Sequence, residues 1–277
     1  MKRLLQIEWI KLWNNRSSRA LIIAYFVLIT LIATLTSIRI DWGPLHFKVA
    51  DAGIFNFPYI WHFNTFMIAF LKVFLAIIIV SLISNEYTHK TVKQNLIDGL
   101  SKGEFIASKV LMIGVLSLAS TFFVLLISLT LGFIHSDFTA LSVVFMDMEY
   151  LLAYLIKLFA FFSFCFFAGM LVKRSAFALG FLFIWFIAGE FVPFAYLASQ
   201  GSKDLADKVF QFFPFGSMWA TIPEPLSRLG AIRAAAEQVG ETISKDYSIQ
   251  LLPMMMAVLW SAFFIWGSWA LLKKRDL

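Results

Sequence analysis

The sequence predicts an all-α polytopic membrane protein, and three observations support this. Hydrophobic residues make up 60% of the 277 residues and charged residues only 14%, whereas a soluble domain has roughly 25% charged residues. Six apolar runs each approach the ~20 residues that a helix needs to cross a hydrocarbon core. Because these runs do not alternate apolar and polar residues, we expect helices and not the strands of a barrel.

The six predicted spans form a single transmembrane domain over residues 1–277. They cover residues 20–38, 62–84, 110–134, 150–172, 176–197 and 251–272. An N-terminal segment (residues 1–19), an inner loop (85–109) and a long outer loop (198–250) complete the chain. Besides its six transmembrane helices, the expected fold therefore has an N-terminal interfacial helix, a helix in the inner loop and short outer helices between the fifth and sixth spans.

Lysines and arginines in the loops predict the orientation. With the N-terminus inside, the inner segments hold 14 basic residues and the outer segments hold seven. Since basic residues favour the cytoplasmic side, we expect both termini and the loop 85–109 in the cytoplasm. The basic residues flank apolar runs and form no continuous stripe, so nucleic-acid binding is not expected despite a net charge of +6.

The N-terminal segment is predicted to be an interfacial helix over residues 1–19. Its two faces differ: Leu5, Trp9, Leu12 and Trp13 share one, and Glu8, Lys11 and Asn15 share the other. Such a helix lies along a membrane surface with its apolar face in the headgroup region.

The inner loop is predicted to hold a short helix from about Thr88 to Leu96. Val92 and Leu96, four residues apart, fall on one side of it, and Gly99 is placed to end it in a left-handed conformation. Ser101 and Glu104 then have the spacing of a capping box, directly before the apolar run that begins at Phe105. The third transmembrane helix is therefore expected to start at this capped turn.

The outer loop 198–250 contains too many apolar residues for a free loop. Seven of them surround Pro214 and Gly216: Val209, Phe210, Phe212, Phe213, Phe215, Met218 and Trp219. We expect a short helix or re-entrant hairpin in the outer interface here. A second, water-facing helix is expected over Leu226 to Val239, which is rich in alanine, arginine and glutamate.

Motifs for catalysis and cofactors are missing from the sequence. No glycine is followed by lysine and then serine or threonine, so we expect no nucleotide cofactor in this chain. The four histidines have no metal-binding spacing, and no serine, histidine and acid grouping stands out. We therefore expect no catalytic residues, no metal site and no enzyme, and Cys165, the single cysteine, is expected in the core.

Three charges fall inside predicted spans, namely Lys72, Lys157 and Glu190. A charge there costs a few kcal/mol or more unless it is paired or hydrated. One interpretation is that the three line a substrate pathway. The other is that the lysines reach toward the interface and Glu190 pairs with one of them as a structural link. Pro193 follows Glu190 by three residues, so the helix is expected to open there.

Two motifs resemble a known family. The first is Glu8-Trp9-x-Lys11, and the second is Asn85-Glu86-Tyr87-Thr88-x-x-Thr91-Val92-Lys93-Gln94-Asn95-Leu96 closing on Asp98-Gly99-Leu100-Ser101. With six spans, they resemble the permease subunit of type-2 ABC exporters (type V fold), most closely bacterial permeases of the lantibiotic-immunity and bacitracin-resistance kind. The architectural match covers the whole chain, and the motif match covers only the N-terminal helix and the inner loop.

The resemblance implies a permease dimer, of two identical or two paralogous chains, in the bacterial cytoplasmic (inner) membrane. Two separate ATP-binding cassette subunits would bind MgATP and seat the inner loop as a coupling helix. The docking residues carried over are Glu86, Thr88, Thr91, Val92, Lys93, Gln94, Asn95, Leu96, Asp98 and Gly99. Glu8, Trp9, Lys11 and Trp13 would belong to the interfacial helix. Aromatic-rich spans suit an amphipathic peptide or a lipid-like substrate.

Two other functions stay open at this point. One is an ion-coupled secondary transporter that uses Lys72, Lys157 and Glu190. The other is a membrane anchor through which an ATPase acts mechanically on an envelope protein bound at residues 198–250.

Overall fold

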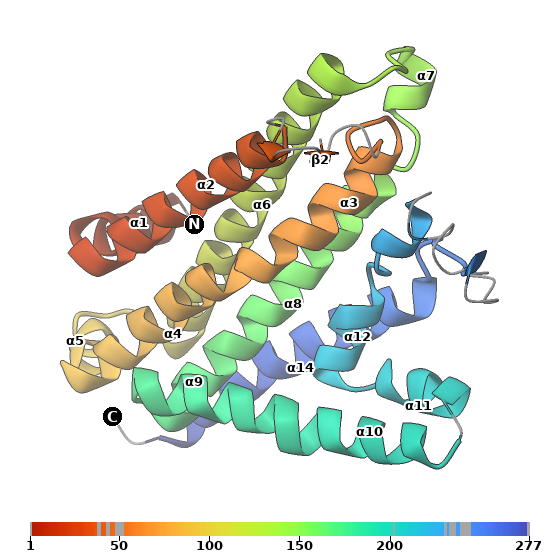
Figure 1. The fold of residues 1–277 in the computed structure, drawn as a ribbon. Helices are drawn as coiled ribbons and strands as arrows, with labels where there is room; N and C mark the ends of the chain where they lie inside the picture. The colour runs from red at the N-terminus through yellow and green to blue at the C-terminus, as the bar shows by residue number, and fades with distance from the viewer. Residues whose placement is uncertain are drawn as a thin grey trace.

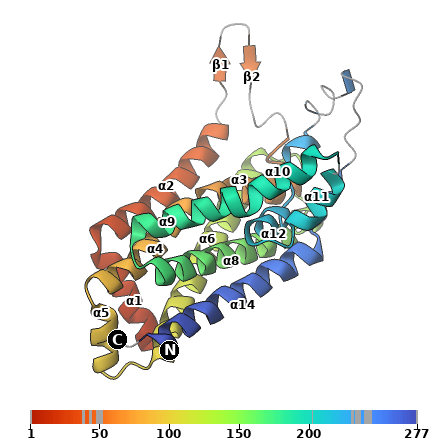
Figure 2. The same ribbon diagram turned by 90° about the horizontal axis from the view of Figure 1, so that it is seen from below.

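In a computed structural model, six helices are long and apolar enough to cross a membrane, which confirms the predicted fold class. The structure describes residues 2–37, 40–42, 45–47, 53–201, 203–229, 232, 237–238 and 245–275. Both termini and the short helix α5 lie at one end of the helical bundle (Figure 1), and a second view agrees (Figure 2).

Most helices of the first four spans are continuous, but the second span is interrupted. The elements up to that point are α1 (Lys2–Asn14), α2 (Arg16–Ser37), the antiparallel strands β1 (Ile40–Trp42) and β2 (Leu45–Phe47), α3 (Tyr59–Ile68), the 3₁₀ turn η2 (Ala69–Leu71) and α4 (Lys72–Thr88). The next are α5 (Thr91–Ile97), α6 (Lys102–His135), α7 (Leu141–Val144) and α8 (Glu149–Val172).

The fifth span and the elements after it are more broken. They are α9 (Ser175–Ile184), a π-helical segment η3 (Trp185–Phe191), α10 (Val192–Ser199), α11 (Lys203–Phe210), α12 (Pro214–Ala220), the 3₁₀ turn η4 (Leu226–Arg228) and α14 (Leu251–Lys274). Pro193, which lacks a backbone N–H, is the second residue of α10 and lies two residues after the end of η3. The predicted opening of this helix is therefore present as a π-helical turn.

The N-terminal helix is shorter than residues 1–19. It ends at Asn14, and the side chain of Asn15 accepts hydrogen bonds from the backbone N–H groups of Ser17 (3.0 Å) and Ser18 (3.3 Å). This is an N-cap, so Arg16 to Arg19 belong to the start of α2. The predicted end of the first span, Ile38, lies outside the described residues.

Helix α8 is the centre of the bundle and packs against α14, α4 and α6 (Figure 1). It is buried on nearly all sides, as expected for a helix that is apolar all round. Phe164 of α8 stacks on Phe264 of α14 with ring centroids 4.2 Å apart, and Cys165 is fully buried beside it. The core position predicted for Cys165 is confirmed.

The apolar part of the outer loop folds into α11 and α12, as the prediction of short outer helices requires. Helix α12 packs on α14 and α8. Gly216 of α12 approaches the preceding chain so closely that a Cβ there would lie 1.8 Å from the carbonyl oxygen of Phe210. Only glycine fits this turn.

The described residues that follow α12, up to Leu229, pack over α3 and α8. The His62 ring stacks on Tyr150 at 4.3 Å, its Nε2 lies 2.8 Å from the Pro223 carbonyl oxygen, and its Nδ1 lies 3.3 Å from an Arg228 guanidinium nitrogen. The Tyr59 hydroxyl donates to the Pro225 carbonyl at 2.7 Å. The helix predicted over 226–239 does not start at Leu226: η4 is a single 3₁₀ turn, Leu229 after it is extended, and most of the following residues lie outside the described residues.

We expect Gly216→Ala to destabilise the protein by about 1–3 kcal/mol or more, because the added methyl group overlaps the backbone. Thermal unfolding of the purified protein in detergent measures this. Gly180→Ala is the matched control, since nothing lies within 4 Å of a Cβ at that helical position and alanine favours helix. Equal unfolding temperatures for the two variants would contradict the close approach of Gly216 to the Phe210 carbonyl.

Candidate functional site

The segment between α4 and α6 contains a shorter helix than the sequence predicts. Helix α4 continues to Thr88, Lys90 then adopts a left-handed conformation with φ = 57°, and α5 starts at Thr91. The predicted start at Thr88 is therefore wrong by three residues. The reason is that α4 runs past the apolar stretch and turns only at Lys90.

The predicted C-cap of α5 and the predicted N-cap of α6 are both confirmed. Gly99 has φ = 96°, its N–H bonds the carbonyl of Leu96 (3.2 Å), and the N–H of Leu100 bonds that of Asn95 (3.0 Å). These two bonds form a Schellman motif. Ser101 and Glu104 form the complete capping box at the start of α6. A well-defined turn therefore joins α5 to α6.

Five of the ten residues in the predicted docking set are exposed. Val92 is buried and Leu96 is partly buried against the core, while Ile97 is 74% exposed. Thr91 and Asn95 are half-buried, and the exposed members of the set are Thr88, Lys93, Gln94, Asp98 and Gly99. The apolar surface residue is thus Ile97 in place of Leu96. Docking itself stays a prediction.

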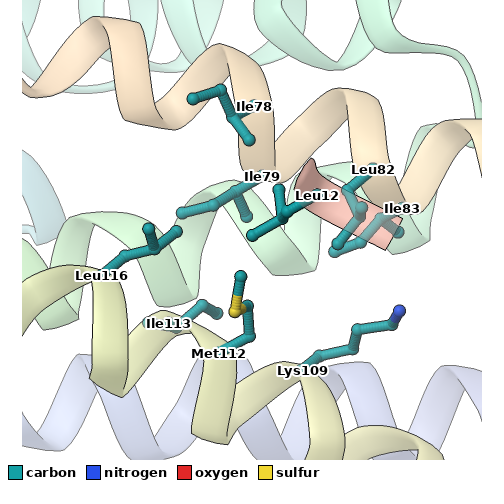
Figure 3. Close-up of a pocket in the computed structure, with 9 residues that line it drawn as sticks. All are labelled: Leu12, Ile78, Ile79, Leu82, Ile83, Lys109, Met112, Ile113 and Leu116. Carbon is teal, nitrogen blue, oxygen red and sulfur yellow. The ribbon is translucent and has the colours of Figure 1, made fainter. Parts of the chain in front are cut away.

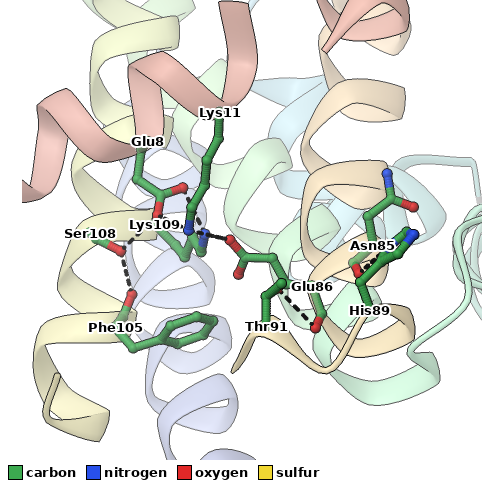
Figure 4. A network of polar contacts seen from close by, with 9 residues as sticks. All are labelled: Glu8, Lys11, Asn85, Glu86, His89, Thr91, Phe105, Ser108 and Lys109. Carbon is green, nitrogen blue, oxygen red and sulfur yellow. Dashed lines mark hydrogen bonds and ion pairs between the residues drawn. The ribbon is translucent and has the colours of Figure 1, made fainter. Parts of the chain in front are cut away.

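Beneath α5 lies a buried group of four charges, here named the ion cluster: Glu8 and Lys11 of α1, Glu86 of α4 and Lys109 of α6 (Figure 4). Lys109 Nζ lies 2.7 Å from Glu8 Oε2 and 2.6 Å from Glu86 Oε1. Lys11 Nζ lies 2.8 Å from Glu86 Oε1 and 3.3 Å from Glu8 Oε1. Two ammonium groups thus neutralise two carboxylates.

Because the ion cluster is buried, its pairing contributes strongly to the stability of the fold. Lys109, Glu8 and Glu86 are only 1%, 3% and 5% exposed, and a buried charge is tolerated only with a partner. Burial alone lowers the pKa of Lys11, but the carboxylates of Glu86 and Glu8 outweigh this and raise its pKa above the ordinary value. Lys11 therefore stays charged at neutral pH.

Two predicted roles are corrected by this arrangement. Glu86 is inside the ion cluster, so it is not available on the surface for a docking partner. The prediction that Glu8 and Leu12 lie on opposite faces of α1 is wrong, because both side chains are buried, at 3% and 1% exposed. Trp9 and Trp13 stack at 5.9 Å and are 45% and 42% exposed, so the indoles form the outward face of α1.

An apolar seam continues from the ion cluster between α1, α4 and α6 (Figure 3). Leu12 of α1, 1% exposed, projects between Ile79 and Ile83 of α4 and Met112 of α6. The remaining cavity is ≈ 10 Å³, about the space of one water. The three helices are therefore closely packed as well as ion-paired.

The last residues of α14 also meet this end of α4 and α6. Arg275 lies 5.3 Å from the Tyr87 ring and donates to the carbonyl of Met170 in α8 (2.7 Å). Lys102 Nζ, at the start of α6, donates to the carbonyls of Lys273 (3.3 Å) and Arg275 (3.1 Å). Contacts of residues just before and just after α5 thus reach α1, α8 and α14.

Sequence reasoning did not find the ion cluster. Glu8 and Lys109 are 101 positions apart, and by sequence Lys109 is only a basic residue at the edge of a predicted span. The available signal is one carboxylate in the N-terminal segment, Glu8, and one in the inner loop, Glu86, but nothing in the spacing pairs them with Lys109.

The three intramembrane charges are not brought together as the pairing interpretation requires. The carboxylate of Glu190 accepts hydrogen bonds from the Trp185 indole (3.0 Å) and from the backbone N–H groups of Phe215 (3.1 Å) and Gly216 (2.9 Å). It caps α12 and has no lysine partner among the described residues. Lys72 and Lys157 contact aromatic rings.

A known protein family matches the part of the chain that contains α5 and the ion cluster. Residues 4–189, which include the ion cluster and α5, match a family model described as an ABC-2 family transporter protein. None of the curated proteins matches the chain. The match supports the permease family and does not extend to the lantibiotic-immunity and bacitracin-resistance subtype. Because it covers well over half of the chain, this multi-pass membrane protein belongs to the ABC-2 family of transporter membrane subunits.

Proposed function

We propose that the protein is the permease subunit of an ATP-driven exporter in a bacterial cytoplasmic membrane. Two separate ATP-binding subunits, each with MgATP, drive it through α5, and a second permease chain, identical or paralogous, completes the transporter. The substrate is an amphipathic peptide or a lipid-like molecule. Both termini and α5 share the cytoplasmic side.

The convergence of helices at the base of α5 is the observation that carries this proposal. Glu86, five residues before α5, and Lys109, twelve residues after it, join the same ion cluster. Tyr87 and Lys102 add contacts with the end of α14. A displacement of α5 therefore moves α4 and α6 directly and α1, α8 and α14 through their contacts.

The ion cluster allows a small shift without loss of its pairing. Glu86 uses only Oε1 for its lysine partners, and its Oε2 is buried without a hydrogen-bond partner among the described residues. Lys11, which is the most exposed member, can exchange one carboxylate oxygen for the other as α1 slides. We propose that ATP-driven closure of the partner subunits shifts α5 and that this exchange accompanies the movement of the helices.

The exposed side of α5 suits a groove on a soluble subunit. Ile97 supplies an apolar contact at its end, and Lys93, Gln94 and Asp98 supply polar contacts around it. A protein interface commonly has this layout of an apolar centre and a polar rim. The ion-coupled alternative relied on Glu190 and the lysines acting together, and Glu190 is committed to the backbone of α12.

We expect Ile97→Asp, alone or with Lys93→Glu, to abolish binding of the ATP-binding subunit, because a charge replaces the apolar centre of the contact. Pull-down of that subunit with the tagged permease measures binding. Leu141→Asp is the matched control, since Leu141 is 67% exposed in α7, far from α5. Normal recovery of the partner with Ile97→Asp would contradict docking through α5.

We expect Lys109→Met to destabilise the protein by roughly 3–5 kcal/mol, since it leaves two buried carboxylates with one half-exposed lysine. Replacing all four charged residues by methionine (Glu8→Met, Lys11→Met, Glu86→Met and Lys109→Met) should restore most of this stability, because a whole buried ion group can be replaced by apolar residues of similar volume at little cost. Thermal unfolding distinguishes the two variants.

The same four-residue variant tests the role of the ion cluster in coupling. We expect it to fold and to bind the ATP-binding subunit, but to lose the stimulation of ATP hydrolysis by the permease, because the helices no longer move as one unit. ATPase activity of the purified complex in nanodiscs is the measurement. Full stimulation would show that the ion cluster only stabilises the fold.

A further inference from the structure

Lys72 and Lys157 lie at one depth in the bundle. Lys72 is 16 residues before the end of α4 and Lys157 is 15 residues before the end of α8, which places both roughly 22–24 Å from the α5 end. Lys72 Nζ lies 4.5 Å from the centroid of the Phe161 ring. Since Phe161 is one helical turn from Lys157, both lysines lie along the packed contact of α4 and α8.

Neither lysine has an anionic partner among the described residues. Lys157 is only 3% exposed, and its Nζ contacts the rings of Phe66 (5.7 Å) and Trp219 (5.9 Å). Lys109, equally buried, has two carboxylates within hydrogen-bond distance. Aromatic rings stabilise an ammonium group less than a carboxylate does. The lysine pair therefore has capacity for an anion that the described chain does not supply.

A single aromatic layer separates Lys157 from the outer surface of the helices. Phe66, Phe70 and Trp219 pack edge to face, with centroids 5.5–6.1 Å apart. Phe66 is buried, whereas Phe70 and Trp219 are 54% and 51% exposed, and Val73 beside them is 50% exposed. The approach to the lysines is thus apolar, as a hydrocarbon chain requires and a free ion in water does not.

We propose that Lys72 and Lys157 bind the anionic headgroup, a phosphate or a carboxylate, of an amphipathic molecule whose hydrocarbon chain lies against Phe70, Val73 and Trp219. This names the substrate class of the exporter and so rests on the function proposed above. Trp219 belongs to α12, whose first turn is held by Glu190. Helix α12 therefore covers Lys157 through Trp219.

The test measures binding to the purified permease without its ATP-binding subunit, so the result does not depend on transport or coupling. Lysophosphatidylglycerol and lysophosphatidylcholine share one acyl chain and one phosphate but differ in net charge. In phosphatidylcholine nanodiscs, we expect the anionic lipid to bind roughly tenfold more tightly, which corresponds to one charge-assisted contact. Native mass spectrometry reports both affinities.

Lys157→Gln should remove most of this preference for the anionic lipid. Lys72→Gln should weaken the preference, and because Lys72 is half-exposed, this variant provides a test even if Lys157→Gln folds poorly. Lys245→Gln is the matched control, because Lys245 is 43% exposed at the outer loop and pairs with Glu224. Equal affinities for the two lysolipids, or an unchanged preference in both lysine variants that fold, would overturn the proposal.

Two further binding experiments distinguish a free anion, a bilayer lipid and a transported amphiphile as the molecule bound by the two lysines. Inorganic phosphate alone should not displace the lysolipid, and displacement by it would overturn the assignment to an amphiphile. The second experiment repeats the binding measurement in nanodiscs that contain phosphatidylglycerol. If lysolipid binding is lost there, the occupant is a bilayer lipid, and the site holds a structural lipid and not a substrate. A failed ATPase assay with intact lysolipid binding would refute the exporter and leave the site standing.

Discussion

Lys109 lies between the carboxylates of Glu8 and Glu86, and the arrangement at the α5 end of the protein depends on this contact. Two buried carboxylates from different helices cannot both stay ionised next to each other without a cation between them. Helix α1 can therefore dock only where Lys109 is, and α4 and α6 must keep their relative position to share it. The Leu12 seam then packs against the same three helices. Electrostatic pairing thus determines where α1 lies, and apolar packing determines how closely.

Sequence reasoning succeeded where the determinant is local. The six spans follow from the length of the apolar runs, and the turn after α5 follows from Gly99, Ser101 and Glu104, whose effects reach only three or four residues. It failed where a residue's role depends on a distant segment. Val92 and Leu96 share one side of α5, but that side packs against the core, so the exposed apolar residue is Ile97 and not Leu96.

Glu190 shows a different limit of the sequence. A buried carboxylate requires compensation, and the two lysines at similar depth were the obvious candidates. The structure satisfies Glu190 with the free N–H groups at the start of α12 and an indole N–H. Backbone donors of a short helix carry a partial positive charge and stabilise an anion. Such donors are invisible to a search for opposite charges, because every residue except proline has one.

Two departures from α-helical geometry in the spans, η2 and η3, border α12. Phe70 of the 3₁₀ turn η2 contacts Trp219, and Glu190 of the π-helical segment η3 holds the first turn of α12. On the side of α5, by contrast, α4, α6 and α8 are continuous and joined by buried contacts. Continuous helices transmit a displacement along their length, and 3₁₀ and π segments are where helices change direction or register most easily. Under the proposed coupling, a shift that starts at α5 would therefore be carried by α4 as a rigid rod up to Lys72, where η2 would absorb it next to the lysine pair and the aromatic side chains that cover it.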